Sequence, residues 1–310
     1  KQISPLGSVL AGLPVPASVG KLLLFGLVFR ITTPIIAIAA RICERCPFST
    51  NDEDRHEVNR VRTYYAGSSD SDLIGFWNMY QAYRDAINPR QFCEENRLYF
   101  DSMCRIDRLV NQLHSELTRL EFLPFAQSDA HAGNTELLLA VLGGVSCSDS
   151  LCEVTCGQKK SSLPKLTLLN GRRLVLNTSS VLSKQKSLHL THRLISCGEI
   201  FTSASNAITR ASLATPVSFS SIALLSGIVR SYQRHGTEEV DMYIANELFA
   251  TMHLSVDLCR VQLRRALAAV MGNIAVDPHR IEAPAVDRTV DGCITFLLHS
   301  REATITSFVS

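Results

Sequence analysis

The residues of this chain best suited to chemistry are polar side chains at the ends of predicted strands. Asn177, Ser179 and Ser180 form such a group, and Thr202 and Ser203 are a second polar pair in the predicted barrel region. Amide and hydroxyl groups in such places can reach phosphate or ribose 2′-hydroxyl oxygens. The same residue types also form turns through hydrogen bonds to their own backbone. Ligand contact and turn formation therefore both stay open for these five residues.

Three further polar residues are candidates on helical stretches. Asn96 precedes an amphipathic segment on which Arg105 lies off the apolar stripe, where a guanidinium could meet a phosphate. An exposed arginine without an assigned partner is, however, more often ordinary surface. Lys21 lies between Gly20 and an apolar run, where it could cap a helix or face another domain.

Ten cysteines raise the question of a metal or disulfide framework. Cys43 and Cys46 have CxxC spacing, and Cys147, Cys152 and Cys156 lie close together. A zinc site needs four ligands turned inward, and no second pair stands at zinc-finger distance. We therefore expect reduced, buried thiols in an intracellular protein and no metal site.

Nucleotide hydrolysis has no residues to support it in this chain. No Gly-x-x-x-x-Gly-Lys-Ser/Thr loop is present, so ATP cannot be bound by the P-loop route. Asp52, Glu53 and Asp54 form an acidic run of solvated surface rather than a magnesium site. The nine histidines are scattered without a paired nucleophile, which disfavours a freestanding enzyme.

Composition permits a fully folded chain but does not identify a ligand. The 310 residues are 46% hydrophobic, enough for two or three small domains. With 31 basic and 29 acidic residues, any nucleic-acid contact must come from a local patch. Arg30 and Thr32-Thr33-Pro34 interrupt the apolar run from Leu22 to Ala40, which favours two short buried helices over a membrane span. Because Lys1 is not an initiator, we expect the chain to be part of a longer one.

The elements that must position the candidate residues change character along the chain. Residues 30–123 predict an all-helical bundle, in which Asp72 caps the helix over 73–86 and a helix begins near Pro89. One stripe at three- and four-residue spacing marks its longest helix and comprises Ile106, Leu109, Val110, Leu113, Leu117 and Leu120.

Beyond Gly143-Gly144 the apolar runs become short and strand-like. The stretches are 151–156, 165–169, 173–176, 193–196, 222–225 and 240–245, with turns such as Asn170-Gly171 between several of them. Short strands over about 100 residues fit a small barrel of the OB type. A helix over 248–271 follows, and residues 293–298 predict an extra strand.

Several stretches resemble the helicase-associated region of DEAH/RHA-type RNA helicases. They are Leu6-Gly7, Leu13-Pro14-Val15, Gly20 to Gly26, Pro34 to Ala40, Pro47-Phe48, Ser71-Asp72, Phe92-Cys93, Asn96 with Leu98, Ala140 to Leu142, Ser179-Ser180-Val181, and Glu199 with Thr202-Ser203. Each motif is short, and their order over about 1–230 carries the resemblance.

The resemblance implies an α+β multidomain chain. Its expected parts are a winged-helix remnant (1–30), a ratchet helical bundle (31–123), a linker (124–135), an OB-type barrel (136–247), a closing helix (248–273) and a C-terminal extension (274–310). It implies that the site residues contact single-stranded RNA, and that Lys21 and Asp72 face RecA-like motor domains of the same protein. ATP and Mg²⁺ are expected on that motor, with a G-patch-type activator or ribonucleoprotein subunits as possible partners.

Departures from the family pattern leave a second interpretation open. Leu73, Arg97, Asp101 and Phe201 stand where the family has other residues, and Phe201 replaces a lysine. Each lost cation removes a phosphate contact. A scaffold or assembly factor that does not unwind RNA is therefore the alternative to a helicase accessory region.

Overall fold

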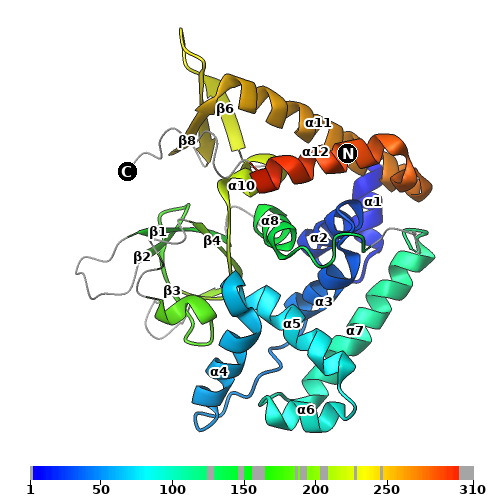
Figure 1. Ribbon diagram of the computed structural model, residues 1–310, viewed down its shortest axis with the longest axis vertical. Coiled ribbons are helices and arrows are strands. Elements are labelled where there is room, and N and C mark those ends of the chain that lie inside the picture. The colour runs from blue at the N-terminus through cyan, green and yellow to red at the C-terminus, as the bar shows by residue number, and fades with distance from the viewer. Residues whose placement is uncertain are drawn as a thin grey trace.

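The computed structural model describes residues 3–123, 129–145, 150–155, 165–185, 188, 194–202, 209–226, 229–244 and 247–299. A small barrel lies at one side of the helices and a second, separate sheet lies beside α11 (Figure 1), which confirms the predicted α+β class. The helices are α1 (Pro5–Gly12), α2 (Ala17–Val28), α3 (Thr32–Cys43), α4 (Arg55–Ala66), α5 (Asp72–Asp85), α6 (Pro89–Glu95), α7 (Phe100–Arg119), α8 (Thr135–Val145), α10 (Phe219–Leu225), α11 (Leu254–Val276) and α12 (Pro284–His299). The strands are β1 (Leu151–Thr155), β2 (Lys165–Leu168), β3 (Arg173–Leu176), β4 (Leu194–Thr202), β5 (Thr209–Pro216), β6 (Val229–Gln233), β7 (Glu239–Ile244) and β8 (Glu247–His253).

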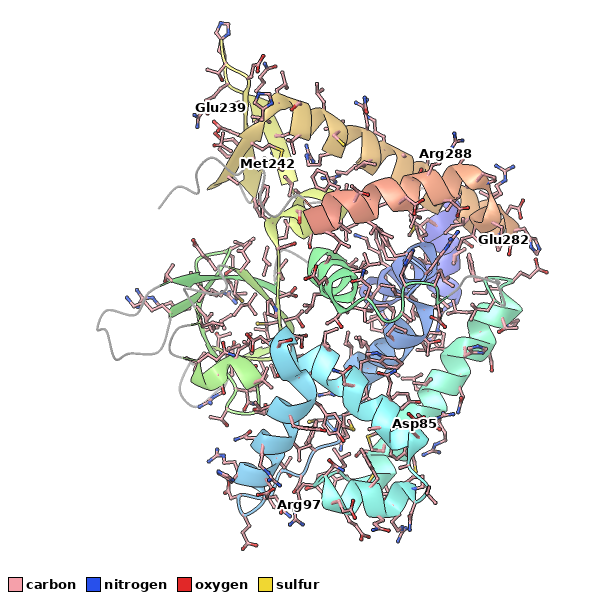
Figure 2. All side chains as sticks on the ribbon, in the orientation of Figure 1. Asp85, Arg97, Glu239, Met242, Glu282 and Arg288 are labelled. Carbon is pink, nitrogen blue, oxygen red and sulfur yellow. The ribbon has the colours of Figure 1, made fainter. Side chains whose placement is uncertain are left out.

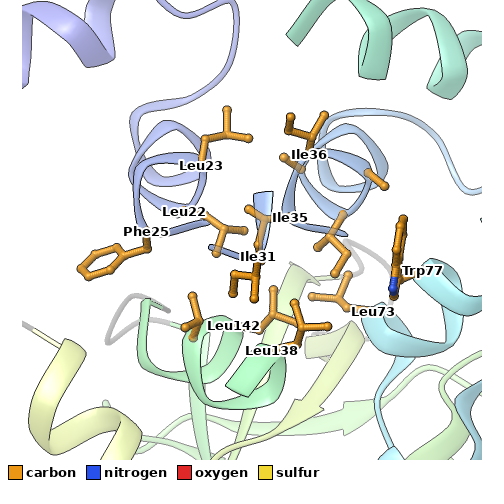
Figure 3. Packing of buried hydrophobic residues seen from close by; sticks show 14 of the residues in the cluster. Leu22, Leu23, Phe25, Ile31, Ile35, Ile36, Leu73, Trp77, Leu138 and Leu142 are labelled. Carbon is orange, nitrogen blue, oxygen red and sulfur yellow. The ribbon is translucent and has the colours of Figure 1, made fainter. Parts of the chain in front are cut away.

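The largest core belongs to the helical bundle. Helices α2, α3, α5 and α8 bring their apolar faces together (Figure 3), and Ile31 and Ile35 are fully buried among them. Helix α7 adds the predicted stripe, of which Ile106, Leu113 and Leu117 are fully buried. Burial of such side chains contributes about 1.5–3 kcal/mol each, so this core supplies most of the stability of the bundle.

Side-chain caps set the starts of two helices of the bundle. Asn88 accepts a hydrogen bond from the Gln91 backbone N–H at 3.2 Å and starts α6 at Pro89, as predicted. Ser71, not the predicted Asp72, caps α5, because its Oγ accepts from the Ile74 N–H. Asp72 is the first residue of the helix, and its carboxylate is free to bond elsewhere.

The five strands β1 to β5 close into a barrel in the order β1-β2-β3-β5-β4. All pairs are antiparallel except β3 and β5, which run parallel. Strand β5 was not predicted, since its small residues bury both faces and leave no alternation of apolar and polar positions. The barrel interior is a separate core that includes Cys152, Ile195 and Ala211.

One residue of the barrel faces the helices instead. Leu213 of β5 has a φ of +55°, and the register between β4 and β5 skips Gly198 and Leu213. No extra residue is inserted, because the register is the same on both sides, so the irregularity is confined to the left-handed backbone of Leu213. Leu213 is buried in the core of the helical bundle, and Gly198 leaves room for it on β4.

Strands β6, β7 and β8 form their own antiparallel sheet, so the predicted barrel over 136–247 is too long. The reason is that residues 222–225, predicted as a strand, belong to helix α10, which Ser218 caps by accepting from the Ser221 N–H. Helix α10 separates β5 from β6 and prevents the sheet from continuing around the barrel (Figure 1).

The last two helices also differ from the prediction. Helix α11 starts at Leu254 rather than 248, because β8 occupies the preceding residues and His253 caps the helix. Residues 293–298 lie in helix α12, not in a strand. In the described part of the chain no single helix meets the length and hydropathy of a membrane span, although α1 and α2 would do so together across a bend of 106°.

Candidate nucleic-acid interface

Two adjoining clefts lie between helix α4 and the turn that follows strand β3. One encloses about 310 Å³ and the other about 510 Å³. Asn59 and Arg62 of α4 and Thr178 and Ser179 of the turn line both. We call this pair of clefts the α4–β3 groove. Its bundle side also includes Arg41, Phe48, Arg55 and His56, and its barrel side includes Asn177, Ser180, Glu199 and Ser212.

The α4 wall of the groove carries a regular polar stripe. Arg55, Asn59 and Arg62 are spaced by four and three residues, which places them on one face of the helix. All three line the smaller of the two clefts, of about 310 Å³, beside Val58. The stripe gives this wall two cations and an amide, the side chains that most often contact phosphate and sugar.

Arg62 ties the two walls together. Its guanidinium lies 4.2 Å from the centre of the Phe48 ring and donates to the backbone carbonyl of Ser179. A third contact joins its Nη2 to the Cys46 Sγ at 3.2 Å. The Arg62 Nε is buried without a hydrogen-bond partner among the described residues. The arginine is therefore held in place between the two walls.

The opposite wall is the turn that begins at Asn177. The Asn177 Oδ1 accepts from the Ser179 N–H at 3.2 Å, and the buried Ser180 Oγ accepts from the Leu182 N–H at 3.4 Å. Both side chains thus form the turn, as the alternative interpretation of the sequence allowed. They position Ser179, which lines both clefts.

Asp72 joins helix α5 to the barrel below the groove. Its two carboxylate oxygens accept from the backbone N–H of Val181 at 2.9 Å and of Ala214 at 2.8 Å. Burial raises the pKa of this carboxyl, and the two N–H donors partly oppose that shift. The resemblance implied that Asp72 faces a motor domain; within this chain its carboxylate accepts from two backbone N–H groups.

Four other predicted site residues lie outside the groove lining. The Asn96 amide donates to the Phe92 carbonyl at 2.9 Å and caps α6, while Arg105 bonds Ser102 and lies 3.7 Å from Glu44. Thr202 meets Thr209 across β4 and β5 at 3.3 Å. The Lys21 ammonium lies 5.6 Å from the Phe25 ring. Ser203 lies outside the described residues.

The groove also contains arginines that the sequence analysis did not name as site residues. The spacing of Arg55, Asn59 and Arg62 was a usable signal, because it marks one helix face that combines basic and amide groups. Arg41 gave no such signal. It lies on the apolar helix α3, is almost fully buried, and approaches Glu199 of β4 at 3.8 Å.

Two of the buried thiols in the described residues have environments that keep them protonated, whereas Cys43 and Cys259 are exposed. Burial raises the pKa of Cys93 to about 11 and that of Cys293 to about 12. Cys152 and Cys197 meet in the barrel core with their sulfurs 3.8 Å apart. In the same part of the chain, no group of three or more His, Cys, Asp or Glu residues has metal-binding geometry.

The known proteins reported below as similar to this chain are all named as ATP-dependent RNA helicases. No family model matches the chain. It is 32% identical over 148 residues to the DExH-box ATP-dependent RNA helicase DExH1 of Arabidopsis thaliana, a match to 46% of the chain and 15% of the relative. It is 28% identical over 139 residues to the ATP-dependent RNA helicase DHX29 of Homo sapiens, or 43% of the chain and 10% of the relative. A third relative, the probable ATP-dependent RNA helicase DHX34 of Homo sapiens, is 31% identical over 121 residues, or 36% of the chain and 10% of the relative.

The chain thus spans about 15% or less of the length of these relatives. The matches agree with the resemblance found in its motifs, and their partial coverage agrees with its departures from the family pattern. The homologues of this chain are DExH/DEAH-box ATP-dependent RNA helicases, and the chain is a divergent relative of their helicase-associated region.

Proposed function

We propose that the chain is an RNA-binding accessory region of an ATP-dependent RNA helicase and that the α4–β3 groove holds a single strand of RNA. The motor would lie in other domains of the same protein. There, RecA-like domains would bind ATP and Mg²⁺, and motor closure would pull the strand past the helical bundle. All three relatives described above are helicases by name, and we therefore propose this function rather than the scaffold.

The observation that carries the proposal is the pairing of two unlike walls. The α4 wall offers the Arg55 guanidinium and the Asn59 amide, while the turn offers Ser179 and Thr178. Guanidinium groups neutralise phosphates, and hydroxyl groups can read the 2′-hydroxyl that distinguishes RNA from DNA. The groove therefore supplies both a charge contact and a sugar contact to one strand.

Carboxylates that line the groove would repel a phosphate, but two of them are engaged by neighbouring donors. The Asp72 carboxylate already accepts two backbone hydrogen bonds, and Glu199 lies beside Arg41 and accepts from the Ser212 hydroxyl at 2.5 Å. These two carboxylates are therefore largely engaged by neighbouring donors, while the third acidic residue of the lining, Asp52, is exposed to solvent. Arg55 has no carboxylate partner within ion-pair distance among the described residues, so its charge stays available to a phosphate.

We further infer that the barrel is of the OB type and that the helices before it are the ratchet bundle. Five strands that close with β3 parallel to β5 support the first assignment. The order of bundle, barrel and following helix supports the second. Partners such as a G-patch-type activator would bind elsewhere on the full protein.

The test is RNA binding by the full-length protein with Arg55→Ala. We expect a severalfold loss of affinity for single-stranded RNA, and a slope of log affinity against log salt that is shallower by about 0.7, the value for one lost phosphate contact. Fluorescence anisotropy over a salt series measures both quantities. Arg55→Lys should keep most of the slope, since it keeps the charge.

A matched control is Arg265→Ala, which removes an exposed arginine of α11 on the opposite side of the molecule from α4 (Figure 1). RNA-stimulated ATPase should fall for Arg55→Ala and stay unchanged for Arg265→Ala. If Arg55→Ala and the unmodified protein have equal RNA affinity and an equal salt slope, the proposal that the α4–β3 groove binds RNA is wrong.

A further inference from the structure

The β6–β7 hairpin presents an aromatic pair to solvent. Arg230 and Tyr232 alternate along β6 on the face opposite to the sheet core, and Arg230 pairs with Tyr243 across the strands. The rings of Tyr232 and Tyr243 lie edge to face with centres 5.7 Å apart. Tyr232 is 58% exposed, an unusual position for a large ring on a regular strand.

The other face of the same strands is firmly anchored. Val240, Met242 and Ile244 of β7 are buried against helix α10 and the rest of the chain. Figure 2 marks Met242 and Glu239 on this hairpin, near the end of the molecule that lies farthest from α4. The tyrosine pair is thus mounted on a rigid sheet and not on a loop.

Charge on the outer face favours an anionic ligand at one end. Arg234 is neutralised by Asp241 at 2.9 Å and by Glu239 at 2.7 Å. Arg230 is exposed, and no carboxylate among the described residues lies within ion-pair distance of it. The face therefore combines two ring surfaces with one cation that is free to contact a phosphate.

A single-stranded nucleic acid fits these dimensions better than a folded protein. One base can stack on one ring while the adjoining phosphate meets one guanidinium. A stable protein partner would need about 800 Å² on this surface, with a continuous apolar centre. Here the two rings are flanked by the charged group of Arg234, Glu239 and Asp241, which offers no such centre.

We propose that the outer face of β6 and β7 is a second contact for single-stranded RNA, with a base stacked on Tyr232 and a phosphate on Arg230. The proposal rests on the RNA-binding function argued above but uses a surface separate from the α4–β3 groove. One long strand, or its flanking segment, would touch both sites.

The experiment compares two oligouridylates on the full-length protein. One has about 8 nucleotides, within the range that one OB barrel covers, and the other about 30 nucleotides. Tyr232→Ala should weaken the longer RNA about tenfold, within the range measured for loss of one stacked base, and leave the shorter one unchanged. Tyr232→Phe should bind both like the unmodified protein, because the ring remains.

Arg230→Ala is the second variant, and it should make the salt slope for the longer RNA shallower by about 0.7. Ile87→Ala, which removes a fully exposed apolar side chain next to α5, serves as the control and should change neither affinity. Ultraviolet crosslinking of the longer RNA should label the peptide that contains Tyr232.

The outcomes separate the two sites. Full affinity of Tyr232→Ala for the longer RNA overturns this proposal. The proposal is also overturned if Tyr232→Ala keeps its RNA affinity but no longer binds a protein partner that the unmodified protein binds. If the groove proposal fails while this one holds, Arg55→Ala is neutral on both lengths and Tyr232→Ala still weakens the longer RNA. If this one fails alone, Arg55→Ala weakens both lengths and Tyr232→Ala neither.

Discussion

The five-stranded barrel meets the helical bundle through several polar contacts beside the apolar side chain of Leu213, whereas the β6–β8 sheet is held by an apolar core and one buried ion pair. At the barrel, Asp72 bonds two backbone N–H groups, and the Ser71 hydroxyl meets the Thr215 hydroxyl at 2.9 Å. At the sheet, Phe219, Met242 and Met252 pack together. The pair of Asp257 and Arg260 lies beneath them in α11.

The contrast is between polar contacts, which set the orientation of the barrel, and apolar contacts, which hold the β6–β8 sheet in place. Hydrogen bonds have preferred angles, so the polar junction fixes how the barrel faces α4 and therefore the width of the α4–β3 groove. Apolar contacts gain free energy with area and tolerate small shifts. We expect damage at the barrel junction to change RNA affinity and damage at the sheet to change stability first.

The largest expected effect is that of Arg260→Ala at the sheet. The guanidinium bonds Asp257 at 2.6 and 2.7 Å, the Ala223 carbonyl at 3.3 Å and the Ser231 hydroxyl at 2.9 Å. Its removal leaves a buried carboxylate unpaired, which should lower the free energy of unfolding by about 3–5 kcal/mol. Urea unfolding followed by circular dichroism measures the change.

Replacing both partners offers a sharper version of that measurement. Asp257→Leu with Arg260→Met leaves no isolated charge, so the double variant should be more stable than Arg260→Ala. If the double variant is as unstable as the single one, the stability comes instead from the hydrogen bonds of Arg260 to the Ala223 carbonyl and the Ser231 hydroxyl.

Asp72→Ala should have the next largest effect. It leaves the N–H groups of Val181 and Ala214 without their acceptor, at a cost of about 1–3 kcal/mol each. We expect the free energy of unfolding to fall by about 2–4 kcal/mol and RNA affinity to fall as well. Asp85→Ala, at the exposed end of α5, should stay within about 0.5 kcal/mol.

The raised pKa of Asp72 adds a pH dependence with a definite sign. The ordinary pKa of an Asp is about 3.9, and burial raises that of Asp72 in the folded state. The folded protein then binds more protons than the unfolded chain between the two values, so this residue's contribution to stability falls as pH rises through that window. Asp72→Asn should remove this component of the pH profile. A wild-type protein that instead loses stability relative to Asp72→Asn on acidification would contradict the assignment.

A smaller effect is expected where α8 crosses α10, between the two regions. A Cβ on Gly144 would lie 2.6 Å from the Ser221 carbonyl oxygen and 2.8 Å from the Leu225 Cβ. Gly144→Ala should therefore cost about 1–3 kcal/mol. Gly272→Ala on α11 meets nothing within 4 Å and should instead stabilise the helix by about 0.5–1 kcal/mol. Thermal unfolding of the two variants should give shifts of opposite sign.

The sequence predicted the helices well where local chemistry decides them. Asn88 with Pro89 starts α6, and the stripe from Ile106 to Leu117 identifies α7, because caps and periodicity act within a few residues. Residues 293–298 show the opposite case. Their β-branched and aromatic side chains favour a strand, yet Val286, Val290, Cys293 and Leu297 form a buried helical stripe that only the longer window reveals.

The candidate site was predicted on one wall only. The polar group from Asn177 to Ser180 was found because its residue types stand out after a strand. The α4 wall was not predicted as part of the site, since nothing local indicates that the barrel lies opposite Arg62. Arg41 comes from a buried helix, and its approach to Glu199 depends entirely on tertiary packing.

Leu213 has a consequence for how this chain can change over generations. Its left-handed backbone sends a side chain of the barrel into a socket of the helical core, and Gly198 on the neighbouring strand makes room for it. The barrel and the bundle are therefore not interchangeable parts. A barrel exchanged by recombination would bring a side chain that does not fit the site filled by Leu213 in the helical core. The barrel and the bundle must therefore be inherited together and diverge together.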